Sequence, residues 1–236
     1  MESYGTDLAY IHDAGFSNFS LNAAPGLLAI LRRNGIDHGL VVDLGCGSGI
    51  WARQLSFAGY GVFGVDVSPA MIRLARKRAP KAKFVSASLL DTELPKCAAV
   101  TAIGECLSYA LQDDESGKKL NRLLRRIRRA LPSGGVFVFD FVKSGRMPRK
   151  GYWMGDDWAV LVEAGAAGDR ILTRQITSFR KTGSSYRRTG EIHRLRMYEE
   201  AEMEAALQRA GFAVERLKAY GALRLRSWHG GMLARR

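Results

Sequence analysis

A glycine-rich turn follows an apolar run that ends at residue 44. The segment reads Val41-Val42-Asp43-Leu44-Gly45-Cys46-Gly47-Ser48-Gly49, and a helical pattern begins at Ile50. Glycines let the backbone approach a ligand closely, and the free amides at the start of a helix attract an anionic group. Asp43 adds a carboxylate that suits a cationic amine. The segment therefore predicts a site for a ligand with an amino acid end.

A second carboxylate, Asp66, ends the next apolar run and is followed by Ser68-Pro69. A carboxylate at this place can accept hydrogen bonds from both hydroxyls of a ribose. The turn differs from the dinucleotide fingerprint because Ile50 stands where a further glycine is required. This departure disfavours a nicotinamide or flavin dinucleotide, and so does Asp43, because a carboxylate there suits a cationic amine better than a pyrophosphate. The alternative is structural: Asp43 would cap the turn, and Asp66 would share a helix cap with Ser68.

Two kinds of segment, short apolar runs and longer amphipathic stretches, alternate from residue 40 to residue 141 and must position these residues. Short apolar runs between longer amphipathic stretches predict βαβ units and a parallel sheet covered on both faces. In such a sheet the ligand binds outside the carboxyl ends of the strands. Strands are expected at 40–44, 61–66, 83–86, 98–103 and 136–141, and helices at 50–57, 70–79 and 116–131.

The pattern changes after residue 141. Residues 143–156 are rich in glycine and proline and predict a loop, whereas the runs at 158–163, 170–180 and 185–198 predict an antiparallel appendage. Lys181-Thr182-Gly183-Ser184 is typical of a hairpin connection. A helix at 199–210 and strands at 213–220 and 231–234 are expected to complete the fold.

These motifs carry a resemblance. Asp43 to Gly49, with Gly64-Val65-Asp66-Val67-Ser68-Pro69 and Leu131-Pro132-Ser133-Gly134-Gly135, resembles the class I S-adenosylmethionine-dependent methyltransferase family over about residues 38–141. The resemblance implies a single Rossmann-like α/β domain with a doubly wound, mostly parallel seven-stranded sheet. Its expected parts are an N-terminal lid and helix (1–37), a cofactor-binding core (38–141), an antiparallel β insertion that covers the acceptor (143–198) and a return to the core (199–236).

The resemblance also implies S-adenosylmethionine as cofactor and S-adenosylhomocysteine as product. The glycine turn would hold the methionine end, Asp66 the ribose, and the end of the third strand the adenine. Many relatives have an aspartate where this chain has Ser88, so either Ser88 or Asp91 contacts adenine. The implied cofactor-binding residues are Asp43, Gly45, Cys46, Gly47, Gly49, Asp66, Val67, Ala87, Ser88, Leu89 and Ile103.

Acceptor-facing residues are expected after the fourth strand, where similar enzymes place them. Glu105 is the leading acid–base candidate and Tyr109 the second. His12, in a stretch that looks like a mobile lid, and His193, in the insertion, are further catalytic candidates. Glu191 and His193 share one face of their strand, and Arg194 and Arg196 share the other. Either face could cover the acceptor, and Arg174 could join it.

The charge balance leaves alternatives open. The 236 residues include 36 Lys and Arg against 23 Asp and Glu, a net charge of +13, which could attract nucleic acid or acidic small molecules. Five arginines, at 122, 125, 126, 128 and 129, are expected on the outer face of one helix. A methyltransferase for a small-molecule acceptor is the favoured interpretation. An RNA methyltransferase and a cofactor-binding protein without turnover are the alternatives.

The cysteines, the histidines and the length of the apolar runs bear on metal binding, cellular compartment and membrane contact. The three cysteines have neither disulfide nor zinc-ligand spacing, and the four histidines are scattered. No metal site is expected. No apolar run has the roughly 20 residues that span a bilayer, so a cytoplasmic protein without membrane contact is expected. The sequence leaves open the oligomeric state, the acceptor and the atom methylated.

Overall fold

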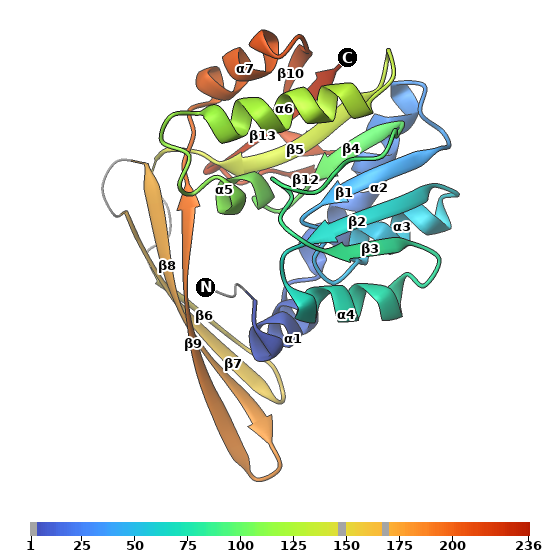
Figure 1. Cartoon of the computed structure of the whole chain (residues 1–236). Coiled ribbons are helices and arrows are strands. Elements are labelled where there is room, and N and C mark those ends of the chain that lie inside the picture. Colours follow the sequence, from blue (N-terminus) through green and yellow to red (C-terminus); the bar gives the residue numbers. More distant parts are fainter. Residues whose placement is uncertain (1–3, 146–149, 167–169) are drawn as a thin grey trace.

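The computed structural model describes residues 4–145, 150–166 and 170–236. Seven strands form the central sheet, in the order β10-β13-β5-β4-β1-β2-β3 (Figure 1). The five strands from β1 to β5 are parallel to one another, and β13 is antiparallel to its neighbours β5 and β10. The bounds are β1 (Leu40–Leu44), β2 (Gly61–Asp66), β3 (Lys83–Ser86), β4 (Ala99–Ala102), β5 (Val136–Val142), β10 (Ala213–Leu217) and β13 (His229–Arg235).

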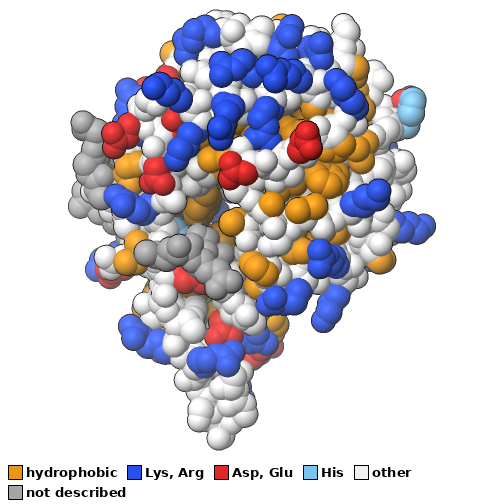
Figure 2. Space-filling view, viewed as in Figure 1, with side chains coloured by type: hydrophobic (Ala, Val, Ile, Leu, Met, Phe, Trp, Pro, Cys, Tyr) orange, Lys and Arg blue, Asp and Glu red, His pale blue; other side chains and the backbone are white. Residues whose placement is uncertain are grey.

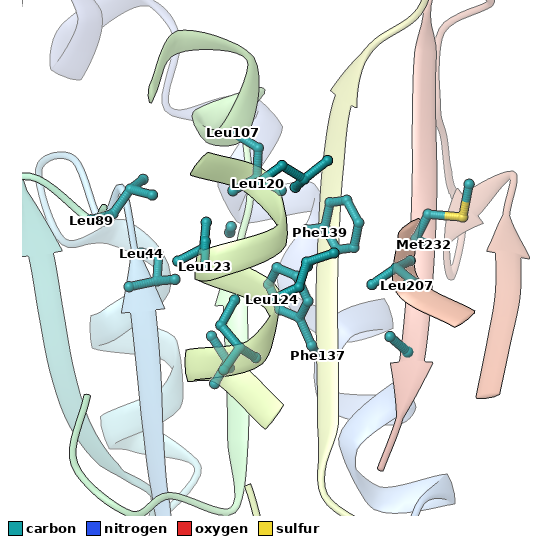
Figure 3. Close-up of a cluster of buried hydrophobic side chains, with 14 of the residues drawn as sticks. Leu44, Leu89, Leu107, Leu120, Leu123, Leu124, Phe137, Phe139, Leu207 and Met232 are labelled. Carbon is teal, nitrogen blue, oxygen red and sulfur yellow. The ribbon is translucent and has the colours of Figure 1, made fainter. Parts of the chain in front are cut away.

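Helices cover both faces of this sheet, as the sequence pattern predicted. One face packs against α2 (Asn18–Arg33), α3 (Ile50–Phe57) and α4 (Pro69–Arg78), and the other against α5 (Cys106–Ala110), α6 (Lys118–Ala130) and α7 (Glu200–Arg209). The alternation along β5 explains the two cores, since Phe137 and Phe139 point to one face and Val136 and Val138 to the other. Figure 3 shows the phenylalanine side beneath α6.

The basic helix α6 buries its leucines and exposes part of its arginine face. Arg122, Arg125 and Arg129 are exposed, as predicted, and positive side chains gather in this region of the surface (Figure 2). Arg126 and Arg128 depart from the prediction because they are partly buried. Their guanidinium groups donate to the carbonyl oxygens of Leu90 and Gly211. These two arginines therefore attach the helix to neighbouring segments.

The antiparallel insertion forms a separate four-stranded sheet that projects away from the core (Figure 1). Its strands, in spatial order, are β6 (Lys150–Met154), β7 (Trp158–Ala166), β8 (Ile171–Thr182) and β9 (Ser185–Arg196). The predicted hairpin is confirmed, with Thr182 opposite Ser185. The loop predicted over 143–156 is wrong at Lys150–Met154, and residues 146–149 lie outside the described ranges. Glycine weakens the strand pattern in the sequence, but Gly151 lies opposite Val162 in the pairing of β6 with β7.

Helix α1 (Thr6–Gly15) and a short pair of strands, β11 (Ala219–Tyr220) and β12 (Leu223–Arg224), are the remaining elements of the described ranges. Helix α1 lies between the insertion and the core, where the lid was predicted (Figure 1). The strand predicted over 213–220 stops at Leu217, and β11 pairs instead with β12. The turn between them passes so close to α2 that a Cβ on Gly26 would lie 2.1 Å from the Tyr220 carbonyl carbon. Among the described residues, none of the helices has the length and apolarity to cross a membrane.

Candidate active site

The glycine turn lies at the carboxyl edge of the central sheet, where β1 leads into α3. The amides of Gly45 and Cys46 donate to the Val65 carbonyl oxygen at 2.7 and 3.0 Å, so the turn folds over the end of β2. Gly45 has a φ of +74°, and a Cβ there would lie 2.3 Å from the Cys106 sulfur. Gly47 also has a positive φ, but a Cβ on it would meet no atom within 4 Å. The backbone at Gly47 is therefore open to the close approach of a ligand.

Asp66 is held beside this turn by two backbone amides. Gly47 N–H donates to Oδ2 and Ser68 N–H donates to Oδ1, each at 2.9 Å. Ser68 also caps α4 by accepting from the Met71 amide, so the structural role weighed from the sequence is present. Each carboxylate oxygen keeps a second lone pair for a ligand hydroxyl. Val67, directly after it, is 61% exposed and offers an apolar surface next to that carboxylate.

Asp43 lies deeper, at the end of β1. Its Oδ1 accepts a hydrogen bond from the Thr101 hydroxyl at 2.9 Å, and Trp51 Nε1 donates to that hydroxyl at 3.1 Å. Burial raises the pKa of Asp43 to about 7, against the opposing effect of the Thr101 hydrogen bond. A cationic amine brought to this carboxyl group would favour its ionised form. The free amides of α3 and these two carboxylates thus form a donor and acceptor set that fits an amino acid group joined to a ribose.

The remaining predicted cofactor residues lie along the same edge. Ser88 follows β3, and its hydroxyl accepts from the Leu90 amide at 3.1 Å. Asp91, the alternative adenine contact, has a 74% exposed side chain that lies 3.7 Å from Arg122 on α6. Cys46 is buried, and burial raises the pKa of its thiol well above the usual value. This position suits packing rather than nucleophilic chemistry. Ala87 and Ile103 are partly buried and Leu89 is buried.

Glu105 occupies a constrained position directly after β4. Its φ is +65°, which is rare for a residue with a side chain. The buried Asp140 on β5 holds this backbone, since its carboxylate accepts the amides of Gly104 at 3.0 Å and Glu105 at 2.5 Å. Tyr220 O–H donates to the same carboxylate at 3.1 Å. The chain reversal at Glu105 is therefore fixed by contacts from β5 and β11.

The Glu105 carboxylate joins the core to the insertion. Arg174 on β8 makes two hydrogen bonds to it, Nη1 to Oε2 at 2.8 Å and Nη2 to Oε1 at 3.2 Å. His229 Nε2 contacts Oε1 at 2.6 Å. Burial acts to raise the pKa of Glu105, but the His229 hydrogen bond and the Arg174 charge outweigh it and lower the pKa to about 2. Glu105 is thus an ionised, fully paired carboxylate at neutral pH.

Aromatic and imidazole side chains gather around this ion pair. Arg174 Nη1 donates to the Tyr109 hydroxyl at 3.2 Å, and that hydroxyl lies 3.4 Å from the Tyr4 hydroxyl. The His193 ring centre lies 5.0 Å from that of Tyr4 and 5.5 Å from that of Tyr109. His12 packs edge-on against Tyr4 at 5.2 Å. The four sequence candidates, Glu105, Tyr109, His12 and His193, therefore belong to one cluster.

Polar contacts join α1 to both the core and the insertion. Toward the core, Arg78 on α4 makes two hydrogen bonds to Asp13, at 2.7 and 2.8 Å, and also donates to the Ser48 carbonyl in the glycine turn. Toward the insertion, Arg187 on β9 donates twice to Asp7, both at 2.6 Å. The helix thus covers the sheet edge in a closed arrangement.

The sequence missed several members of the cluster. His229 begins an antiparallel strand opposite Val142, and the amino end of that strand reaches the same edge as the carboxyl ends of its parallel neighbours. The sequence pattern placed that strand only from residue 231. Tyr4 and Asp140 belong to no motif that the sequence pattern identifies. The open choice of insertion face is resolved, since Glu191 and His193 face the cluster while Arg194 is exposed.

No group of three or more His, Cys, Asp or Glu side chains suited to a metal ion occurs within residues 4–145, 150–166 and 170–236. The cysteines in these ranges are free thiols.

Comparisons with known proteins agree with this arrangement. Residues 41–135 match the family model of the methyltransferase domain. A dTDP-3-amino-3,6-dideoxy-α-D-glucopyranose N,N-dimethyltransferase of Streptomyces fradiae is 25% identical over 87% of this chain and 82% of its own length. A cypemycin N-terminal methyltransferase of a Streptomyces species is 30% identical over 65% of this chain and 66% of its own.

Solved structures share the whole fold. An S-adenosylmethionine-dependent methyltransferase from Clostridium acetobutylicum aligns with a TM-score of 0.82 at 18% identity, over 96% of both chains. A sugar N-methyltransferase from a Streptoalloteichus species aligns with a TM-score of 0.79 at 21% identity, over 100% of this chain and 96% of its own. At these identities the structures establish the fold. Together with the family match and the curated relatives, they identify the chain as an enzyme of the class I S-adenosylmethionine-dependent methyltransferase family.

Proposed function

We propose that this enzyme methylates an amine nitrogen on a small, polar, sugar-like acceptor. The observation that carries the proposal is the closed cluster around Glu105, in which Arg174 ties the insertion to the core directly above the sheet edge. We infer that a roof attached in this way excludes a folded macromolecule and admits only a small acceptor. Hydroxyl and imidazole groups line the cluster, and such groups suit a polyhydroxylated ligand.

The proposal that nitrogen is the methylated atom is based on the descriptions of related proteins. The Streptomyces fradiae relative is described as an N,N-dimethyltransferase of a dTDP-linked amino sugar, and the cypemycin relative as an N-terminal methyltransferase. The structural neighbours include a sugar N-methyltransferase and an amino pentose methyltransferase. Their descriptions name an amino sugar, a sugar nitrogen, an amino pentose or an N-terminus, which supports nitrogen as the atom methylated.

For the cofactor, we assign its methionine end to the Gly45–Gly49 turn and Asp43, and its ribose to Asp66. The open backbone at Gly47 and the free lone pairs of Asp66 support this assignment. Val67, Ala87, Ser88, Leu89 and Ile103 are assigned to the adenosine surface. When bound, the sulfonium supplies an electrophilic methyl group for in-line displacement.

Glu105 is assigned a positioning role in place of the acid–base role favoured by the sequence. A carboxyl group with a pKa of about 2 is a weak base at neutral pH. Both of its oxygens already accept hydrogen bonds from Arg174 and His229. Its function here is to hold the roof and to orient those two side chains toward the acceptor. Tyr109 stays a neutral phenol because burial raises its pKa, and it can hydrogen-bond an acceptor hydroxyl or amine.

The proposal is tested by measuring S-adenosylhomocysteine release with a matched acceptor panel. The panel contains dTDP-3-amino-3,6-dideoxyglucose, the same sugar nucleotide with a hydroxyl in place of the amine, free aminohexoses, a short peptide with a free amino terminus, and RNA. Turnover of an aminated sugar with none of its hydroxyl analogue is the expected result. Methylation of the hydroxyl analogue at an equal rate, or of RNA alone, would contradict the proposal.

A further inference from the structure

Glu191 and His193 form a carboxylate–imidazole pair on β9. They are two residues apart on one strand, so both side chains point to the same face, toward the Glu105 cluster. His193 Nε2 lies 2.8 Å from Glu191 Oε2, and His193 is only 2% exposed. His193 is therefore buried and Glu191 is partly buried, and the pair is separate from the one that Glu105 makes with Arg174 on the adjacent strand β8.

This hydrogen bond fixes which ring nitrogen of His193 carries the proton. An ionised carboxylate can only accept, so in the neutral ring Nε2 must be the donor and Nδ1 must hold the free lone pair. Nδ1 is buried and has no hydrogen-bond partner among the described residues. Leaving a buried polar atom unpaired is unfavourable, because the atom has lost its hydrogen bonds to water and gained none in return. An acceptor ligand that places an N–H group at Nδ1 would remove this cost.

The groups that face His193 come from every element packed around it. Tyr4 and His12 lie on the N-terminal segment, Tyr109 lies on α5, and Arg174 is the directly opposed residue on β8. Arg174 is neutralised by Glu105, and burial lowers the pKa of His12 to about 4, which leaves His12 uncharged at neutral pH. His229 also has a carboxylate contact at Nε2 and a buried Nδ1 without a partner among the described residues, but its carboxylate, Glu105, is shared with Arg174. His193 differs because its carboxylate, Glu191, contacts no guanidinium group among the described residues.

Glu191 has a second set of contacts, with the N-terminal segment. Its Oε2 accepts the Tyr4 amide at 2.8 Å, and its Oε1 accepts the Gly5 amide at 3.0 Å. The Tyr4 carbonyl in turn accepts from the Ser68 hydroxyl at 2.7 Å, next to Asp66. One carboxylate therefore contacts both the imidazole and the segment that closes over the cofactor edge. Docking of residues 4 and 5 and orientation of His193 share the same acceptor group.

From these contacts we propose that His193 Nδ1 is the general base that removes the proton from the acceptor ammonium, and that Glu191 positions it when the N-terminal segment is docked. This inference rests on the proposed amine acceptor. The proton moves from the acceptor nitrogen to Nδ1, and the freed lone pair forms the new N–C bond to the methyl carbon. The S–C bond of the sulfonium breaks, and its electron pair remains on sulfur as the thioether. Each new turnover requires His193 to release this proton to solvent.

The first test measures the imidazole itself and does not depend on turnover. In protein saturated with S-adenosylhomocysteine and labelled with ¹⁵N-histidine, NMR shifts report the tautomer of each ring. We expect His193 to carry its proton on Nε2 in the wild type and to lose this preference in Glu191→Gln. His38 pairs with Asp37 on the surface and provides the matched control, because Asp37→Asn should leave the His193 signals unchanged. A proton on His193 Nδ1 in the wild type would overturn the inference.

The second test uses dTDP-3-amino-3,6-dideoxyglucose, or the amine that the acceptor panel identifies. His193→Asn should lower kcat at pH 7 by ~10²-fold or more, with affinity for S-adenosylhomocysteine within twofold of the wild type. Its remaining activity should rise tenfold per pH unit up to the acceptor pKa, since only free amine reacts. Glu191→Gln should show a smaller loss, and His38→Asn none. Wild-type kcat at pH 7 in folded His193→Asn would exclude the base role while leaving the amine acceptor intact.

These experiments distinguish a failure of the proposed amine acceptor from a failure of the inference about His193. If the panel yields only a hydroxyl or carbon acceptor, the proposed function fails, and the assignment of an ammonium proton to His193 fails with it. If an amine is methylated but His193→Asn keeps the wild-type pH profile, only the inference about His193 fails.

Discussion

Arg174 and His193 are directly opposed across β8 and β9, so their side chains lie on the same face of the insertion. Arg174 pairs with Glu105 in the core, and His193 pairs with Glu191 on its own strand. One register position thus places a guanidinium and an imidazole side by side above the sheet edge. The insertion therefore supplies polar groups to the site as well as covering it.

Asp66 is expected to determine cofactor affinity. Asp66→Ala removes the carboxylate assigned to the ribose hydroxyls and also frees the amides of Gly47 and Ser68. Charge-assisted hydrogen bonds contribute about 1.5 to 3 kcal/mol each, so affinity for S-adenosylhomocysteine should fall at least tenfold by calorimetry. Asp37→Asn, at an exposed site, is the control. Unchanged binding by Asp66→Ala would refute the ribose assignment.

Ser88 and Asp91 can be separated by mutation. The Ser88 hydroxyl already accepts the Leu90 amide, and the Asp91 side chain is exposed near Arg122. We expect Ser88→Ala to weaken S-adenosylhomocysteine binding by less than tenfold and Asp91→Asn to leave it unchanged in the same titration. A tenfold loss in Asp91→Asn would transfer the adenine contact to Asp91.

Glu105→Gln should affect stability and rate without moving the pH profile. The substitution leaves the partly buried Arg174 without its charged partner, and breaking a buried ion pair typically costs about 3 to 5 kcal/mol. Urea unfolding should show this loss at pH 7, and kcat should fall. Glu215→Gln, which breaks the exposed contacts with Arg33 and Arg235, should cost less than about 1 kcal/mol. If the acidic limb of the kcat profile between pH 6 and 9 disappeared in Glu105→Gln, Glu105 would regain the base role.

The acid stability of the protein follows from the same carboxylate. Its pKa is about 2 in the folded protein against a reference of 4.5. A lowered carboxyl pKa stabilises the fold fully above the unfolded value, and this contribution is lost as the pH falls from about 4.5 toward 2. In Glu105→Gln this component of the pH dependence should be missing. Unfolding free energies measured at pH 3 and pH 7 test this.

His12 should also make the fold less stable as the pH falls, but over a higher pH range. Burial lowers its pKa from 6.5 to about 4, so the unfolded chain binds more protons between these values and the fold loses stability as the pH falls through them. His12→Asn removes this effect. Relative to the wild type, it should therefore gain about 2 kcal/mol on going from pH 8 to pH 5. Equal pH dependence in the two proteins would mean that His12 titrates normally in the folded state.

The exposed arginines of α6 test the RNA alternative. Replacing Arg122, Arg125 and Arg129 by glutamine should leave turnover and cofactor binding intact, because exposed substitutions usually change stability by less than ~0.5 kcal/mol each. The acceptor panel and thermal unfolding measure both outcomes. A variant that folds but has lost activity, together with RNA binding by the wild type that weakens steeply with salt, would favour an RNA acceptor.

The sheet edge that carries the glycine turn could be predicted from sequence because its signals are local. The strands from Leu40 to Val142 are short apolar runs, and their parallel order follows from the helices between them. Gly45, Gly47 and Asp66 lie in contiguous motifs at strand ends. Parallel strands bring such ends to one edge, so the motif positions already imply that these residues meet.

The arrangement of side chains around Glu105 was decided by tertiary structure. The period of two along β9 separates Glu191 and His193 from Arg194, but both faces carry polar residues, so the pattern alone could not select the buried one. His229 reaches Glu105 only because β13 runs antiparallel to β5, and the two residues are far apart in sequence. The ionised state of Glu105 likewise depends on Arg174 and His229. Their convergence is set by strand register and by the docking of the insertion, which no local pattern in the sequence specifies.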